Sequence, residues 1–178
     1  MAVLAPRRSL KSRAIQLLAQ REHSRVELQR KLMAHARAEV REATPAAQST
    51  ADAADDAGES QAQAAQRVAD LLDWLEAQGH LSPQRFVESR VHARAGRFGN
   101  LRIRQELAQH AMALPAEAVL ALNGSELERA RTVLARKYKA APHDSAEQAR
   151  RARFLASRGF SPETIRQALR RASTEDAP

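Results

Sequence analysis

Short segments with apolar residues three or four positions apart run along most of the chain, and glycine or proline separates them. The first segment, 10–22, places Leu10, Ala14 and Leu17 at this spacing, which is typical of one face of an α-helix. Alanine, with 38 of 178 residues, favours helices, whereas valine, isoleucine and threonine, which favour strands, are sparse. The sequence therefore predicts an all-α protein.

Local start and stop signals divide the chain into helices. Ser24 and Glu27 form a capping box that begins a helix over 24–35. Two serine–proline pairs, Ser82-Pro83 and Ser161-Pro162, place a serine at the cap and a proline at the first helical position. Gly79 ends the helix that contains Val68 to Leu75, and further stops are expected at Gly96, at Asn123-Gly124 before a second capping box (Ser125 to Glu128), and at Gly159.

Nine short helices result, and their repeated order indicates stacked units. We expect an elongated tandem array of three three-helix repeats over 10–79, 82–123 and 125–172, with tails at 1–9 and 173–178. Residues 40–66, within the first repeat, are rich in Ala, Gln, Asp, Glu and Ser and have almost no large apolar residue. This composition predicts a flexible acidic insertion or a loosely helical linker.

The charges are unevenly distributed along the chain. Lysine and arginine total 29 against 21 acidic residues, and all but four of the cations are arginine, whose planar group forms paired hydrogen bonds to phosphate and carboxylate. Residues 1–41 carry ten cations and three anions, 83–110 six and two, and 150–172 seven and one, whereas 42–66 carry no cation. Basic blocks separated by an acidic spacer predict a polyanionic partner, most commonly nucleic acid.

Two groups of arginines are the candidate binding residues. One group surrounds the turn at 96–99 and the other lies on the helix expected at 146–158; together they are Arg90, Arg94, Arg97, Arg102, Arg104, Arg150, Arg151, Arg153 and Arg158. Arg90, Arg94 and Arg97 have the spacing of one helical stripe. Pairing with acids such as Glu88 and Glu106 is the alternative, purely structural role. Because few aromatic residues are available for base stacking, contacts to the nucleic-acid backbone are favoured over sequence recognition.

Few sequence features suggest catalysis. The chain has no cysteine, no phosphate-binding glycine loop, and six histidines without metal-ligand spacing. We therefore expect no enzymatic activity, no catalytic or metal-binding residues and no cofactor. No apolar run approaches the roughly 20 residues that span a bilayer, and the first residues do not resemble a secretion signal. A cytoplasmic protein without membrane contact is expected.

Several short motifs, in this order and spacing, resemble the RecX regulatory proteins of bacteria. They are the stretch from Arg21 to Leu32, Gly79-His80-Leu81, Arg85-Phe86, the stretch from Arg94 to Leu107 with its two glycines, and Phe154-Leu155 followed by Arg158-Gly159-Phe160. The resemblance covers about residues 10–172.

This resemblance implies a modulator of the recombinase RecA. Proteins of this family are arrays of three-helix repeats that lie in the groove of the RecA–DNA filament and inhibit strand exchange, ATP hydrolysis and the SOS co-protease activity. The implied partners are the RecA filament and single- and double-stranded DNA without sequence preference, and we expect a monomer. A stand-alone transcriptional repressor is the alternative, with 24–35 or 162–172 as recognition helix in a symmetric dimer. An enzyme acting on nucleic acid ranks third.

Overall fold

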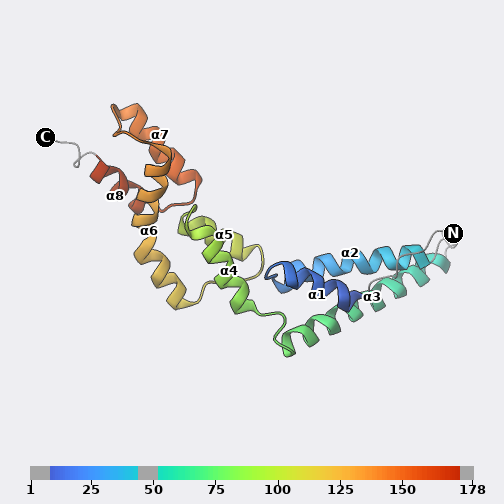
Figure 1. Cartoon of the computed structure of the whole chain (residues 1–178). Helices are drawn as coiled ribbons and strands as arrows, with labels where there is room; N and C mark the ends of the chain where they lie inside the picture. Colours follow the sequence, from blue (N-terminus) through green and yellow to red (C-terminus); the bar gives the residue numbers. More distant parts are fainter. Residues whose placement is uncertain (1–8, 44–51, 173–178) are drawn as a thin grey trace, which may run out of the picture. The chain divides into compact units, whose positions relative to one another are not determined.

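The computed structural model describes residues 9–43 and 52–172, and every regular element within these ranges is an α-helix (Figure 1). The eight helices are α1 (Leu10–Gln20), α2 (Arg25–Ala43), α3 (Asp52–Ala77), α4 (Pro83–Ala95), α5 (Asn100–Ala108), α6 (Ala116–Lys137), α7 (Ser145–Ser157) and α8 (Pro162–Ala172). The predicted all-α class is confirmed. None of these helices is long and apolar enough to cross a membrane, as judged over the described residues.

The predicted tails and insertion are only partly described. Residues 1–8, 44–51 and 173–178 lie outside the described residues. Ser9, expected in the first tail, instead caps α1, because its hydroxyl accepts a hydrogen bond from the Ser12 amide at 3.2 Å. The described parts of the insertion, 40–43 and 52–66, belong to α2 and α3, and Ala64 is buried in the core. A small apolar residue thus contributes to packing where we expected a segment without anchors.

The chain separates into two compact units, 1–86 and 87–178. The division falls within α4, whose first residues belong to the first unit and whose remaining residues belong to the second. The predicted boundaries of three repeats remain a prediction.

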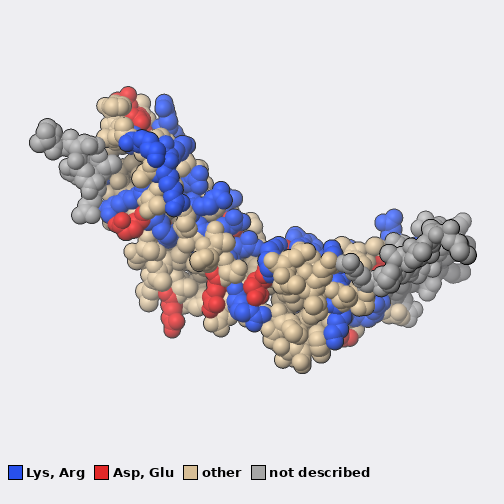
Figure 2. All heavy atoms as spheres, viewed as in Figure 1, with Lys and Arg blue, Asp and Glu red and all other residues tan. Residues whose placement is uncertain are grey.

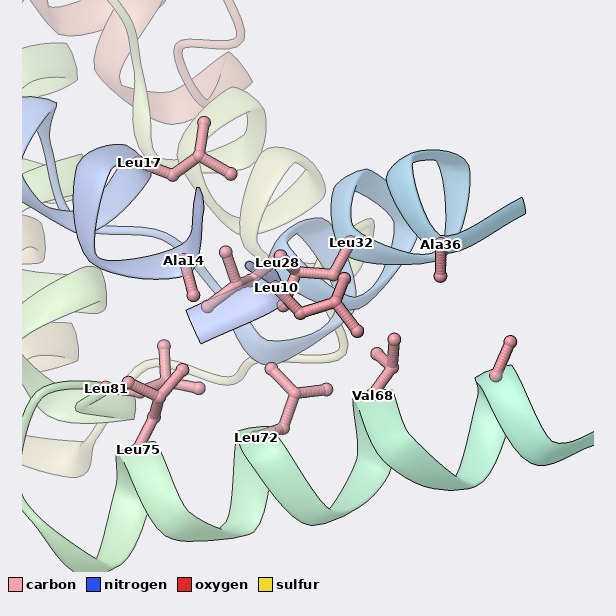
Figure 3. Packing of buried hydrophobic residues seen from close by; sticks show 11 residues of the cluster. Leu10, Ala14, Leu17, Leu28, Leu32, Ala36, Val68, Leu72, Leu75 and Leu81 are labelled. Atoms are coloured by element: carbon pink, nitrogen blue, oxygen red, sulfur yellow. The ribbon is translucent and has the colours of Figure 1, made fainter. Parts of the chain in front are cut away.

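The core of the first unit lies between α1, α2 and α3. The long helices α2 and α3 run side by side (Figure 1), and leucine side chains from both fill the space between them (Figure 3). Leu28, Leu32, Leu72 and Leu75 are fully buried, as is Val68. Their spacing of three and four residues places them on one face of each helix, which explains the pairing.

In the second unit, α6, α7 and α8 surround a separate core. Its buried members are Ala130, Val133, Leu134, Leu155, Phe160, Ile165, Ala168 and Leu169. Two local signals position the elements around it. The Ser161 hydroxyl accepts from the Thr164 amide at the start of α8, and Gly159, with φ of +78°, ends the turn after α7.

The predicted break between two helices at Asn123-Gly124 is wrong, because α6 continues through it. The second capping box is therefore absent. Instead of capping a new helix, the Ser125 hydroxyl donates to the carbonyl oxygens of Ala121 and Leu122, at 2.9 and 3.3 Å, in the preceding turn. The cost of a glycine inside a helix, about 1 kcal/mol, is small against the packing of Leu122, Ala130 and Val133 on either side.

Candidate functional site

The turn between α4 and α5 lies directly against the turn between α7 and α8. The Gly99 amide donates to the Arg158 carbonyl, and the Leu101 amide donates to the Gly159 carbonyl, both at 3.0 Å. A Cβ atom at Gly99 would lie 2.2 Å from the Gly159 oxygen, and one at Gly159 would lie 2.5 Å from the Arg102 Cβ. Both positions therefore require glycine. This contact joins the two predicted arginine groups, which are about 50 residues apart in the sequence.

Three of the candidate arginines surround the ring of Phe98. The guanidinium carbons of Arg94, Arg97 and Arg158 lie 5.7, 5.8 and 5.9 Å from its centre. Arg158 also donates to the Arg97 carbonyl at 3.2 Å, so the backbone of one group orients a side chain of the other. Cations at this distance are attracted to the face of an aromatic ring, which offsets part of their mutual repulsion.

These three arginines are the centre of a basic surface, which extends along α4 and α5 on one side and to α6 on the other. Arg90, Arg94 and Arg102 line a common recess. Lys137 lies 4.0 Å from the centre of the Phe154 ring, which Arg158 also approaches, to 4.6 Å. The sequence analysis did not identify Lys137 as a candidate binding residue. The only sequence signal for it is the aromatic residue that follows, Tyr138. In Figure 2 basic side chains gather on the face of the second unit that carries α5 and α7.

Other candidates differ from the prediction. Arg97 does not share a helical stripe with Arg90 and Arg94, because α4 ends at Ala95 and Arg97 lies in the following turn. Arg151 is only 5% exposed and donates to the Ala140 carbonyl and to Glu147, both at 2.7 Å, while its guanidinium covers the Tyr138 ring. These contacts assign Arg151 to the packing of α7. Arg104 contacts Asn123 at 3.4 Å, and Arg150 and Arg153 are exposed.

A buried carboxylate holds the arginine-bearing elements together. Glu126 in α6 is 4% exposed and accepts from the Asn100 amide at 2.8 Å and from the Ser161 and Thr164 hydroxyls, each at 2.9 Å. It therefore lies at the N-terminal ends of both α5 and α8, where a negative charge interacts favourably with the helix dipole. Sequence reasoning missed it, although Glu126 occupies an apolar position of the helical pattern, four residues after Leu122 and four before Ala130.

Arg129 supports the same region from the next turn of α6. Its guanidinium donates to the carbonyl oxygens of Phe98 and Leu122, at 2.8 and 3.0 Å, and to the Asn100 side chain. The pKa of Arg129 is lowered below its ordinary value because the guanidinium is buried, and the neighbouring carboxylate of Glu126 offsets only part of this effect. Because the carbonyl of Phe98 belongs to the turn that presents the basic surface, Arg129 fixes that turn from behind.

The first unit contains a charged cluster of a different kind. Burial alone would raise the pKa of Glu27, but hydrogen bonds from Arg21 and Lys31 outweigh it and lower the value to about 2. Lys31 lies 3.2 Å from the carboxylate, and buried His23 lies between Lys31 and the Arg21 carbonyl. Burial lowers the pKa of His23, so its ring is neutral near pH 7. The serine half of the predicted capping box is confirmed here: the Ser24 hydroxyl accepts from the Glu27 amide at 3.1 Å.

Neither unit contains a cluster of metal-binding side chains within the described residues. No group of three or more histidine, aspartate or glutamate side chains in residues 9–43 and 52–172 is arranged to hold a metal ion.

Comparisons with known proteins agree on one family. The family model described as "RecX, third three-helix domain" matches residues 125–169. Regulatory protein RecX of Leptothrix cholodnii is 44% identical over 98% of this chain and 96% of its own length. Regulatory protein RecX of Herbaspirillum seropedicae is 42% identical over 96% of each chain. The crystal structure of RecX from Lactobacillus salivarius shares the fold, with a TM-score of 0.61 at 17% identity, covering 93% of this chain and 95% of the other.

Proposed function

Because the chain belongs to the RecX family of regulatory proteins, we propose that it binds the RecA–DNA filament and inhibits its recombinase, ATPase and SOS co-protease activities. It acts as a monomer in the cytoplasm and binds single- and double-stranded DNA without sequence preference. Its role is regulatory, without catalysis of its own.

The observation that carries this proposal is the basic surface of the second unit. Arg94, Arg97 and Arg158 meet around Phe98 although they come from two distant segments. A folded chain brings like charges together at a cost in free energy unless a partner of opposite charge neutralises them. A filament that exposes DNA phosphates and protein carboxylates is such a partner, and guanidinium groups bind both.

The test is hydrolysis of ATP by RecA on single-stranded DNA, measured while this protein is added at ratios well below one per RecA. We expect inhibition at these low ratios, since one molecule lying in the filament groove affects several RecA protomers. An unchanged rate at every ratio would remove the proposed regulation of RecA, while the family membership would stand.

Measurements of DNA binding without RecA distinguish the repressor alternative from our proposal. Backbone contacts release counterions, so the affinity for DNA falls steeply between about 50 and 200 mM salt whatever the sequence. A recognition helix such as α8 would instead prefer one operator over other duplexes by a factor of about a thousand or more. Fluorescence anisotropy with several unrelated duplexes distinguishes the two, because a strong preference for one duplex supports the repressor and contradicts our proposal.

A further inference from the structure

A recess lies between the facing sides of α4 and α5. It has a volume of about 290 Å³ and is lined by Arg90, Arg94, Arg102, Gln105, Glu106, Gln109 and His110. Three of the α5 residues, 102, 105 and 106, and the residue that caps its end, Gln109, are spaced as one face of a helix, and the two arginines of α4 are one turn apart. Five of the seven lining residues therefore belong to two helices, and Gln109 and His110 lie in the turn that follows α5.

The lining carries three arginines and a single acid, and it is rich in hydrogen-bond donors. Glu106, 17% exposed, accepts from Arg94 Nε at 2.8 Å and lies 3.6 Å from Arg102 Nε. Glu106 thus holds one guanidinium group from each of the two helices. Three arginines against one carboxylate leave a net positive recess, and the Gln105 and Gln109 amides add hydrogen-bond donors of no charge.

From this geometry we infer that the recess is a subsite for one backbone phosphate of DNA, an inference that rests on the proposed function and makes it specific. Guanidinium and carboxamide groups approach the occupant from two helices, which suits the tetrahedral oxygens of a phosphodiester. In this subsite Gln105 and Gln109, which are exposed, bind the phosphate together with the arginines.

A protein carboxylate fits the recess less well. Its two oxygens lie in one plane, and Glu106 already occupies that kind of position between Arg94 and Arg102. The recess, at about 290 Å³, also leaves room for a phosphate together with its sugar. DNA is therefore the favoured occupant over an acidic segment of RecA.

The experiment measures binding of the full chain to a single-stranded oligothymidylate of about 20 nucleotides, without RecA, by fluorescence anisotropy at several salt concentrations. The test variant is Gln105→Glu, which puts a second carboxylate into the recess. The matched control is Gln148→Glu in α7, which changes the net charge equally within the same unit but outside the recess. A third variant, Arg102→Lys, keeps the charge and removes the planar donor group. Thermal melting of each variant checks that it is folded.

We expect Gln105→Glu to weaken binding about tenfold or more at about 100 mM salt and to lower the salt slope by about 0.7, the value of one single-strand phosphate contact. Gln148→Glu should weaken it less than about threefold, because its carboxylate lies outside the recess and salt screens its charge. Arg102→Lys should weaken binding with little change of slope. Equal weakening by Gln105→Glu and Gln148→Glu would overturn the subsite, since only net charge would then matter.

The RecA assay, run with the same variants, separates this inference from the proposed function. Weakened DNA binding by Gln105→Glu supports the subsite even if the wild-type chain has no effect on RecA. Inhibition by the wild type together with normal DNA binding by Gln105→Glu keeps the proposed function and refutes the subsite. Normal DNA binding combined with lost inhibition in that variant would assign the recess to RecA and would equally refute a phosphate subsite.

Discussion

Gly99 and Gly159 lie back to back, with no room for a side chain between them: a Cβ atom on Gly99 would be 2.2 Å from the Gly159 carbonyl oxygen. This contact connects the two turns that carry the basic surface, and backbone hydrogen bonds from Gly99 and Leu101 reinforce it. The arrangement of the candidate site thus depends on two glycines, and it can be tested through stability.

Gly99→Ala should destabilise the second unit by about 1–3 kcal/mol, because the added methyl group forces two backbone segments apart. Gly124→Ala is the matched control. Gly124 lies inside α6 with nothing within 4 Å of an added Cβ, so alanine there should stabilise by about 0.5–1 kcal/mol. Urea denaturation of both variants measures the difference, and equal stabilities would contradict the close approach at Gly99.

Glu126→Ala should destabilise the second unit by about 3 kcal/mol or more, because it leaves the Asn100 amide and two hydroxyls buried without their charged acceptor. Glu128→Ala, in the same helix, removes a carboxylate that is 71% exposed and should change stability by less than about 0.5 kcal/mol. Both are measured by chemical denaturation. A small effect at Glu126 would show that the network does not hold α5 and α8 on α6.

Glu27→Gln should remove a pH-dependent part of the stability of the first unit. The pKa of Glu27 is lowered from 4.5 to about 2 in the folded chain, so its ionised form stabilises the fold above pH 4.5. This contribution is lost as the pH falls through about 2. The melting temperature of the wild type should exceed that of Glu27→Gln at pH 7, and the difference should shrink below about pH 5. A difference that is constant from pH 7 to acid would contradict the assigned ion pairs.

Charge reversal at exposed arginines should abolish inhibition of RecA without unfolding the chain. Arg97→Glu combined with Arg153→Glu changes two exposed side chains of the basic surface and leaves the Arg94–Glu106 pair intact. We expect a loss of affinity of about a hundredfold, because attraction to the filament becomes repulsion.

The control for this variant is Arg30→Glu combined with Arg37→Glu, two exposed positions on the same face of α2, two turns apart, that alter the net charge by the same amount. RecA-dependent ATP hydrolysis and a melting curve are measured for both. If the α2 control loses inhibition and the Arg97/Arg153 variant keeps it, the functional surface lies on the first unit.

Much of the local structure of this chain was determined by the sequence by itself. Starts of helices such as Ser82-Pro83 and Ser161-Pro162 were predicted correctly, because a serine hydroxyl bonds to an amide only three residues away, as Ser82 does with Arg85 at 3.2 Å. The buried leucine positions of α2 and α3 followed from helical spacing. The excess of arginine and the resemblance to one family are likewise properties of the sequence alone.

Only the tertiary structure decided which charges form a surface and which form the interior. Arg151 and Arg153 are two residues apart in the same basic helix, α7. Arg151 is nevertheless buried against Tyr138, whereas Arg153 is exposed. Residues 125–128 have the sequence of a capping box, but the packing of α6 on both sides of Ser125 keeps the helix continuous. The contact of Gly99 with Gly159 and the burial of Glu126 join segments that are 26 or more residues apart. Local patterns do not encode such contacts, because the free energy that favours them comes from side chains brought together only when the helices have packed.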